Sequence, residues 1–251
     1  MLNTLGIVQI PSSRSTAQAR HLLGRRLGGK PLLDWVVRRL TESLRLDGVI
    51  AVANSERDYD TLIRLVPSDV PLVAHGEGDP LGSMAAALRQ YPAQAVVRVS
   101  LETPFVDPVL IDQLVSTAAQ CPACDYIGYT SSDGRPAVDS NIGLFGEWVR
   151  VEALRRAHRK ASQPRDRQEV TRFLITRADL FNLCFLPVPA ALDREDLRLK
   201  LAFDEDWEHA ESIYEALGPD GLEWQRIARL VEHQPAIRQK MAQLNQAEAV
   251  A

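Results

Sequence analysis

Short apolar runs alternate with amphipathic helical segments along the first half of the chain. The runs are rich in Val, Ile, Leu and Ala, are bounded by turn residues, and show no alternation of apolar and polar positions. Continuous apolar strands separated by helices are typical of a parallel sheet that is buried on both faces. We expect strands at residues 5–10, 47–54, 71–76, 95–101 and 124–130, and helices at residues 30–44, 57–66, 81–91 and 107–120.

The regular pattern is lost after about residue 130. Residues 131–143 are rich in turn formers, residues 171–189 mix helical and strand features, and the prolines at 187 and 189 end that stretch. The remaining elements expected here are a helix at 148–161, a strand at 197–203, a helix at 204–218 closed by Gly218, and helices within 221–246 with a break at Pro235. We therefore predict an α/β fold, one three-layer α/β/α domain over residues 1–251 with a mostly parallel sheet and an inserted subregion at about 130–190.

The charge distribution is uneven. The chain has a net charge of −4, yet its first acidic residue is Asp34, so the five cations before it leave −9 for the rest. A general nucleic-acid-binding protein would carry positive charge over a much larger surface, and we predict no nucleic-acid partner. The five cations of the opening segment are Arg14, Arg20, Arg25, Arg26 and Lys30.

The lack of targeting signals in the sequence and the small number of cysteines favour a cytoplasmic protein. No apolar stretch reaches the roughly 20 residues that a membrane span needs, and the amino terminus lacks the basic segment of a signal peptide. The chain has three cysteines, too few for the disulfide framework of a secreted protein. Cys121 and Cys124 form a CxxC motif that fits half of a zinc site or a redox pair. Zinc needs further ligands, and with only Cys184 and scattered histidines available we favour two structural cysteines near a helix end.

The basic opening segment follows the first predicted strand directly. Ligands of parallel α/β sheets bind at the carboxyl ends of the strands, and arginine guanidinium groups bind phosphate oxygens in a bidentate manner. The segment contains neither a Walker A motif nor a GxGxxG motif. It therefore predicts a different kind of polyphosphate-binding loop, the alternative being a solvated basic loop.

A series of motifs runs along nearly the whole chain, in the order "VQIPSSRSTAQAR", "LGGKPLLDWVVRRL", "VAHGEGDPLGSM", "VVRVSLETPFVDPVLIDQLV", "DRQEVTRFLITRADLFNL" and "LRLKLAFDEDWEHAESIYEAL". In this order the motifs resemble those of the cytidylyltransferases that activate sugars with CTP, which include the acidic-sugar CMP synthetases and the spore coat polysaccharide biosynthesis protein F group. The resemblance implies a nucleotide-diphospho-sugar transferase-like fold.

The resemblance implies transfer of CMP from CTP, or of the corresponding group of another nucleoside triphosphate, to a sugar or sugar acid used in surface polysaccharide. It also implies Mg²⁺ as cofactor, a homodimer formed through the inserted subregion, and distinct groups of site residues. By position these would be Arg14, Arg20 and Lys30 for catalysis on the phosphates; Ser12, Ser13, Gly76, Asp79 and Gly82 for the nucleotide; Glu147, Asp166 and Arg167 toward the sugar; and Glu102 and Asp204 for the metal.

The chain departs from the family pattern at positions that carry chemistry. The first arginine of the family loop falls on Pro11, and its second metal aspartate falls on Ala202, which has no ligand atom. Its first metal aspartate falls on Glu102, and its histidine falls on Glu169. The aspartate two residues before Glu147 is replaced by Phe145. These substitutions leave open a catalytically weakened homologue that keeps nucleotide or sugar binding, or an assembly role.

Other interpretations of the same residues also stay open. Glu102 and the acidic run from Asp204 to Asp206 fit carboxylates that stabilise helix amino termini, while Asp166, Arg167 and Glu169 fit a surface ion-pair cluster. Asp107 followed by Pro108 is typical of a helix N-cap. A glycosyltransferase that uses the acidic run at 204–206 as its metal motif is a further alternative.

Overall fold

The computed structural model describes residues 2–11, 17–76 and 79–250, and the side chains of all of these except residues 17–20 and 249–250. The strands are β1 (Leu2–Ile10), β2 (Arg26–Leu27), β3 (Lys30–Pro31), β4 (Val49–Ala53), β5 (Leu72–Ala74), β6 (Ala93–Ser100), β7 (Tyr126–Thr130), β8 (Glu147–Arg150) and β9 (Leu183–Pro187). The helices are α1 (Ala17–Gly24), α2 (Leu32–Thr41), α3 (Tyr59–Leu62), α4 (Pro80–Gln90), α5 (Pro108–Gln120), α6 (Val151–Lys160), α7 (Pro164–Gln168), α8 (Arg172–Ile175), α9 (Asp204–Leu217), α10 (Trp224–Glu232) and α11 (Pro235–Val250).

In the described part of the chain, seven strands form one central sheet in the order β5-β4-β1-β6-β8-β7-β9. The pairs β1–β4, β4–β5, β1–β6 and β7–β9 are parallel, whereas β8 is antiparallel to both of its neighbours. The predicted mostly parallel sheet is therefore confirmed. Because β8 runs against the other strands, its first residue lies at the edge of the sheet where β6 ends.

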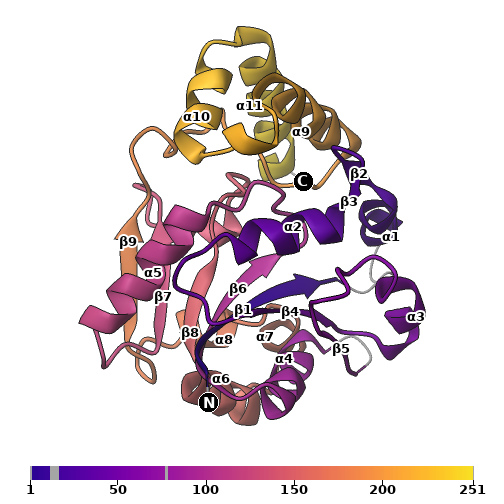
Figure 1. The fold of residues 1–251 in the computed structure, drawn as a ribbon. Coiled ribbons are helices and arrows are strands. Elements are labelled where there is room, and N and C mark those ends of the chain that lie inside the picture. Colours follow the sequence, from indigo (N-terminus) through magenta and orange to yellow (C-terminus); the bar gives the residue numbers. More distant parts are fainter. Residues whose placement is uncertain (1, 12–16, 77–78, 251) are drawn as a thin grey trace.

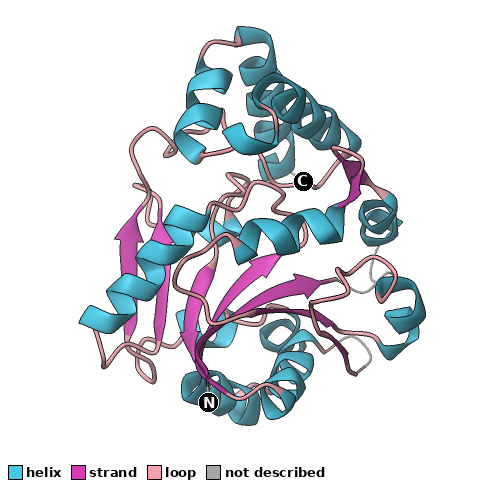
Figure 2. Cartoon of the chain, in the orientation of Figure 1, coloured by secondary structure: helices cyan, strands magenta, loops and turns pink. Residues whose placement is uncertain are grey.

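Helices cover both faces of the sheet, which explains the uniformly apolar strands (Figures 1 and 2). In β1, Leu5 and Ile7 pack with the core under α4, α6 and α8, whereas Val8 and Ile10 pack with the core under α2 and α5. Helices α9, α10 and α11 lie beyond α2 and α5, so this side of the molecule is the thicker one. None of the described helices is both long and apolar enough to span a membrane.

Two helices next to the carboxyl edge begin with an aspartate N-cap followed by proline. Asp107 accepts hydrogen bonds from the backbone N–H groups of Val109 and Leu110, as expected from the sequence. Asp79 caps α4 in the same way by accepting from Gly82 N. Gly218 ends α9 with a φ of 68°, a left-handed value that favours glycine, and this prediction is also confirmed.

One predicted element is wrong, and another begins later than expected. Residues 197–203 form no strand, although Leu197, Leu199 and Leu201 are buried, because the segment makes single hydrogen bonds to loops rather than pairing with a strand. The helix expected from residue 148 begins only at Val151. Strand β8 precedes it without a loop, which hid the strand in the sequence.

Candidate functional site

A pocket of about 520 Å³ opens at the carboxyl end of β6. It is lined by the end of β6 and the turn after it, by the first residue of β8, and by side chains from α7, α8 and the residues between them; Lys200 reaches it from the loop before α9. The carboxyl edge of a parallel sheet is where α/β proteins bind their ligands. This pocket is therefore the candidate functional site.

A buried ion pair forms the floor of the pocket. Arg98 of β6 and Glu147 of β8 face each other in register, and Arg98 Nε donates to Glu147 Oε2 at 2.7 Å. The other carboxylate oxygen accepts from Tyr126 Oη at 2.9 Å and from Thr171 Oγ1 at 2.8 Å, while Arg98 Nη1 donates to Gln9 Oε1 at 2.7 Å. Burial, with the adjacent Glu147 carboxylate, raises the pKa of Tyr126, so the phenol keeps its proton and donates it. The predicted sugar-side residue Glu147 thus lies at the pocket.

A second ion pair lies at the wall. Lys200 Nζ is 3.6 Å from Glu102 Oε2, and the two side chains are 28% and 27% exposed, so both can meet a ligand. The backbone sets this distance, because Leu201 N donates to the carbonyl of Glu102 at 2.8 Å. Gly143 allows the backbone of residues 199–200 to pack closely against it, since a Cβ at this position would lie 2.5 Å from Lys200 N.

The two predicted metal ligands are not brought together. Asp204 does not line the pocket; it is 70% exposed and forms ion pairs with Arg25 at 2.6 Å and His21 at 3.2 Å. Ala202, at the family's second metal position, offers no oxygen ligand from its side chain. Glu102 is left with an ammonium group as its neighbour. Magnesium sites use one or two carboxylates plus substrate phosphates in near-octahedral geometry. The described residues therefore do not fit the predicted two-carboxylate magnesium site.

The predicted nucleotide residues Asp79 and Gly82 lie beside the predicted sugar residue Arg167. Arg167 donates to Asp79 Oδ2 from Nη2 at 2.5 Å and from Nε at 3.2 Å. Its remaining donors contact the carbonyls of His158 and Ala161 and the imidazole of His158. All five guanidinium donors are thus used within the protein, and Arg167 joins α7 to the start of α4.

Gly82 leaves space for this junction, since a Cβ there would lie 2.4 Å from Asp79 Oδ2. Gly76 adopts a φ of 77°, a left-handed value that turns the chain after β5. Asp166 forms an ion pair with Arg172 at 3.4 Å rather than lining the pocket, whereas Glu169 lines it and pairs with Arg165 at 2.9 Å. The roles expected for these residues stay predictions.

Most of the predicted phosphate loop lies outside the described residues. This applies to Ser12, Ser13 and Arg14, and to the side chain of Arg20, whose backbone belongs to α1. Lys30 is exposed on the two-stranded ribbon formed by β2 and β3. The binding of phosphates by these residues remains a prediction, as does the homodimer expected through residues 130–190.

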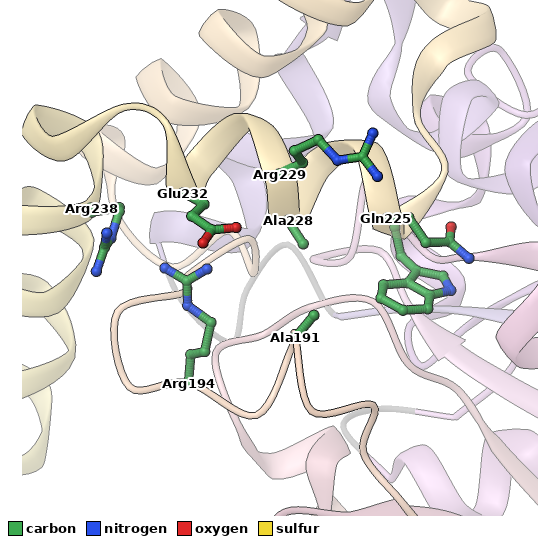
Figure 3. A pocket seen from close by; sticks show the side chains of 8 residues that line it. Ala191, Arg194, Gln225, Ala228, Arg229, Glu232 and Arg238 are labelled. Atoms are coloured by element: carbon green, nitrogen blue, oxygen red, sulfur yellow. The ribbon is translucent and has the colours of Figure 1, made fainter.

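A second cavity of about 500 Å³ lies between α10, the start of α11 and the loop before residue 195 (Figure 3). Ala191 and Ala228 face each other across it, and Arg194 points from the loop toward α10. The guanidinium groups of Arg194 and Arg238 both pair with Asp196, at 2.7 and 2.8 Å. Because Asp196 neutralises two of its arginines and the cavity lies away from the strand ends, this cavity is not the candidate site.

Sequence reasoning missed two functional candidates, Arg98 and Lys200. Arg98 interrupts an otherwise apolar strand, and a charge in such a place predicts a buried partner. Lys200 gave no comparable signal, because its contact with Glu102 joins residues about a hundred positions apart.

Comparison with known proteins agrees with this fold. Residues 12–217 match the model of the MobA-like NTP transferase domain. An uncharacterized protein of Methanocaldococcus jannaschii, MJ1063, is 25% identical over 207 residues, covering 82% of this chain and 81% of that protein. The spore coat polysaccharide biosynthesis protein SpsF of Bacillus subtilis is 24% identical over 200 residues, covering 77% and 80%.

Solved structures share the architecture. A cytidylyltransferase from Leptospira borgpetersenii superposes with a TM-score of 0.81 at 16% identity, covering 95% of this chain and 96% of that one. A CMP:2-keto-3-deoxy-manno-octonic acid synthetase in complex with CTP superposes with a TM-score of 0.58 at 11% identity, covering 85% and 98%. These similarities show the nucleotidyltransferase-like α/β fold, and the family match extends over most of the chain. The protein therefore belongs to the family of MobA-like NTP transferase domains.

Proposed function

We propose that this protein is a cytidylyltransferase that transfers CMP from CTP to a sugar or sugar acid, in surface polysaccharide biosynthesis. The observation that carries the proposal is the pocket at the carboxyl end of β6, where the Glu102–Lys200 pair and the Arg98–Glu147 pair converge. The spore coat relative and the CTP-bound synthetase support the choice of nucleotide and acceptor.

In the proposed reaction an oxygen of the acceptor attacks the α-phosphorus of CTP. A new P–O bond forms, the bond from the α-phosphorus to the bridging oxygen breaks, pyrophosphate leaves with the electron pair, and the proton of an attacking hydroxyl passes to solvent. Negative charge spreads over the non-bridging oxygens in the transition state, and catalysis depends on neutralising it. Lys200 is the accessible cation nearest to Glu102, and we assign it part of this neutralisation.

The Arg98–Glu147 pair has a different role in the proposal. Its hydrogen bonds are satisfied within the protein, so it holds the floor in place instead of exchanging protons with a substrate. Exposed polar side chains of the lining, including Gln168 and Glu169, are suited to hydroxyl groups of a sugar. The acceptor is therefore placed over the floor, with its attacking oxygen toward Glu102 and Lys200.

The first experiment measures CTP binding by calorimetry and pyrophosphate release with a panel of sugars and sugar acids, with and without Mg²⁺. We expect CTP to bind in preference to ATP, GTP and UTP. Lys200→Met should lower kcat/KM by about 100-fold, as is typical for loss of a group that stabilises transition-state charge. Lys240→Met, which removes an exposed lysine of α11, is the matched control and should change little. Absence of CTP binding at millimolar concentration would exclude the proposal.

A catalytically weakened homologue is the second candidate. It is favoured by Ala202 at a metal position and by the pairing of Asp204 with Arg25 and His21. The same assay separates the two, since this candidate binds nucleotide or sugar without releasing pyrophosphate from any acceptor. The acidic run offers little support for a glycosyltransferase, because Asp206 is buried against Arg198 and accepts from the N–H groups of Ala202 and Phe203.

A further inference from the structure

Three cysteines from distant parts of the sequence meet at the far end of α5 from its N-cap. Cys121 follows the last residue of α5, Cys124 ends the short turn after it, and Cys184 is the second residue of β9. One sulfur atom from each lies within 4.8 Å of the others, and all three residues are partly exposed. Among the described residues, this is the only close grouping of at least three Cys, His, Asp or Glu side chains.

The turn that carries two of these thiols is fixed in place. Cys124 N donates to the carbonyl of Cys121 at 3.0 Å, which closes the CxxC turn. Arg150 Nε donates to the carbonyl of Cys124 at 3.0 Å, and its Nη2 donates to the carbonyl of Pro122. Asn182 Nδ2, next to β9, donates to the carbonyl of Ala123 at 3.1 Å. The CxxC turn is therefore fixed against the residue that precedes β9, the strand that carries Cys184.

We propose that Cys121, Cys124 and Cys184 bind one Zn²⁺ ion through three thiolates, with the fourth coordination position open to solvent. Zinc prefers tetrahedral coordination with sulfur at about 2.3 Å, which places bound sulfurs about 3.8 Å apart, compatible with three thiols that lie within 4.8 Å of one another. The CxxC turn is a common zinc-binding unit, and Cys184 supplies the third ligand that the turn lacks on its own.

The charge and the ligand preferences of the three thiolates favour a bound cation over a cluster of neutral, apolar cysteines. Three thiolates within 4.8 Å of one another repel, so they need a positive charge among them. Thiolate ligands select thiophilic ions over magnesium or calcium. The guanidinium of Arg150 beside the turn offsets part of the net negative charge of a tris-thiolate zinc centre.

The consequence for the fold is local. Strand β9 is an edge strand that pairs only with β7 among the described strands. A metal ion shared by the end of α5 and β9 would fix this edge to the helical layer. The inference does not depend on the proposed transferase activity, because the cluster lies outside the pocket lining.

The test uses the full chain, purified under reducing conditions and exposed to Zn²⁺ and then desalted. We expect one zinc per chain by elemental analysis, and loss of that zinc in Cys184→Ser. Glu102→Gln is the control for metal bound in the pocket and should keep its zinc. Zinc content that is unchanged in Cys184→Ser would overturn the proposal.

A second measurement needs no variant and so does not depend on the variant's folding. Titration of the reduced, metal-free chain with Co²⁺ should produce the intense near-ultraviolet thiolate-to-metal absorption and the visible bands of a tetrahedral site, saturating at one equivalent. Added Zn²⁺ should abolish these bands, since it binds the same thiolates more tightly. Failure of the reduced chain to bind either ion would overturn the proposal.

Discussion

Arg98 and Glu147 face each other across the antiparallel pair of β6 and β8, and the Glu147 carboxylate is completely buried. Its two oxygens together accept from Arg98, Tyr126 and Thr171. A buried charge of this kind is tolerated only because its partners satisfy it. The pair therefore links the core of the sheet to the wall of the candidate site.

Removing this carboxylate should destabilise the whole fold. We expect Glu147→Ala to lower the free energy of unfolding by about 3 kcal/mol or more, because it leaves Arg98 unpaired and two hydroxyl donors without an acceptor. Urea unfolding measures the change. Glu152→Ala, at an exposed site paired with Arg155 and Arg159, should cost about 1 kcal/mol or less. Equal effects of the two substitutions would contradict the role assigned to the buried pair.

Arg167 should not tolerate replacement by lysine. A lysine keeps the charge but cannot contact Asp79, His158 and Ala161 at once, so we expect Arg167→Lys to cost about 1–3 kcal/mol of stability. Arg165→Lys, two residues earlier in an exposed pair with Glu169, is the matched control and should be nearly neutral. Thermal unfolding of the two variants checks the difference. A fully stable Arg167→Lys protein would show that α7 does not depend on this contact.

Gly143 should be essential for the position of Lys200. Its φ of 70° is strained for an alanine, and the added Cβ would lie 2.7 Å from the carbonyl carbon of Leu199. We expect Gly143→Ala to cost more than about 1 kcal/mol and to lower pyrophosphate release more than it lowers CTP binding. Gly134→Ala is informative as a control, because its φ of 84° carries the same strain while nothing lies within 4 Å of the added Cβ. If both variants behave alike, strain alone explains the effect and the contact with residues 199–200 does not.

Buried His209 should make the protein less stable in mild acid. Burial lowers its pKa in the folded state, and its Nδ1 has no hydrogen-bond partner among the described residues. Below the unfolded value of about 6.5, the unfolded chain therefore binds more protons and gains stability relative to the folded one. We expect the free energy of unfolding to fall as the pH drops through this range. His209→Gln should reduce the slope, whereas His233→Gln, at an exposed site, should not. An unchanged slope in His209→Gln would assign the pH dependence to other groups.

The layers of the fold could be predicted because each rests on a local pattern. The apolar run of β1 requires cover on both faces, and the Asp107–Pro108 pair marks the start of α5. The alternation of leucine and charged residues at 197–201 was misleading, because Arg198 is as buried as Leu197 and Leu199 and the segment has no neighbouring strand among the described residues to pair with. In β8 the strand passes directly into α6, and no turn residue marks the change.

The candidate site could be predicted less well than the fold, because it depends on contacts between segments that are far apart in the sequence. The resemblance assigned Glu102 and Glu147 to the site, and both line the pocket. It could not show that Lys200 lies beside Glu102, or that Arg167 uses all its donors within the protein. Nor could the spacing of the cysteines show that β9 carries Cys184 next to the CxxC turn.

The antiparallel direction of β8 affects which parts of the pocket can change during evolution. A loop residue can move without disturbing its neighbours, but Glu147 belongs to the hydrogen-bonded ladder that joins β8 to β6. Replacements in the surrounding segments at residues 100–103, 138–145 and 165–175 can therefore change which ligand the pocket fits while the strand pair beneath it keeps its shape. Selection for a new ligand should accumulate changes in those segments and spare the strand pair.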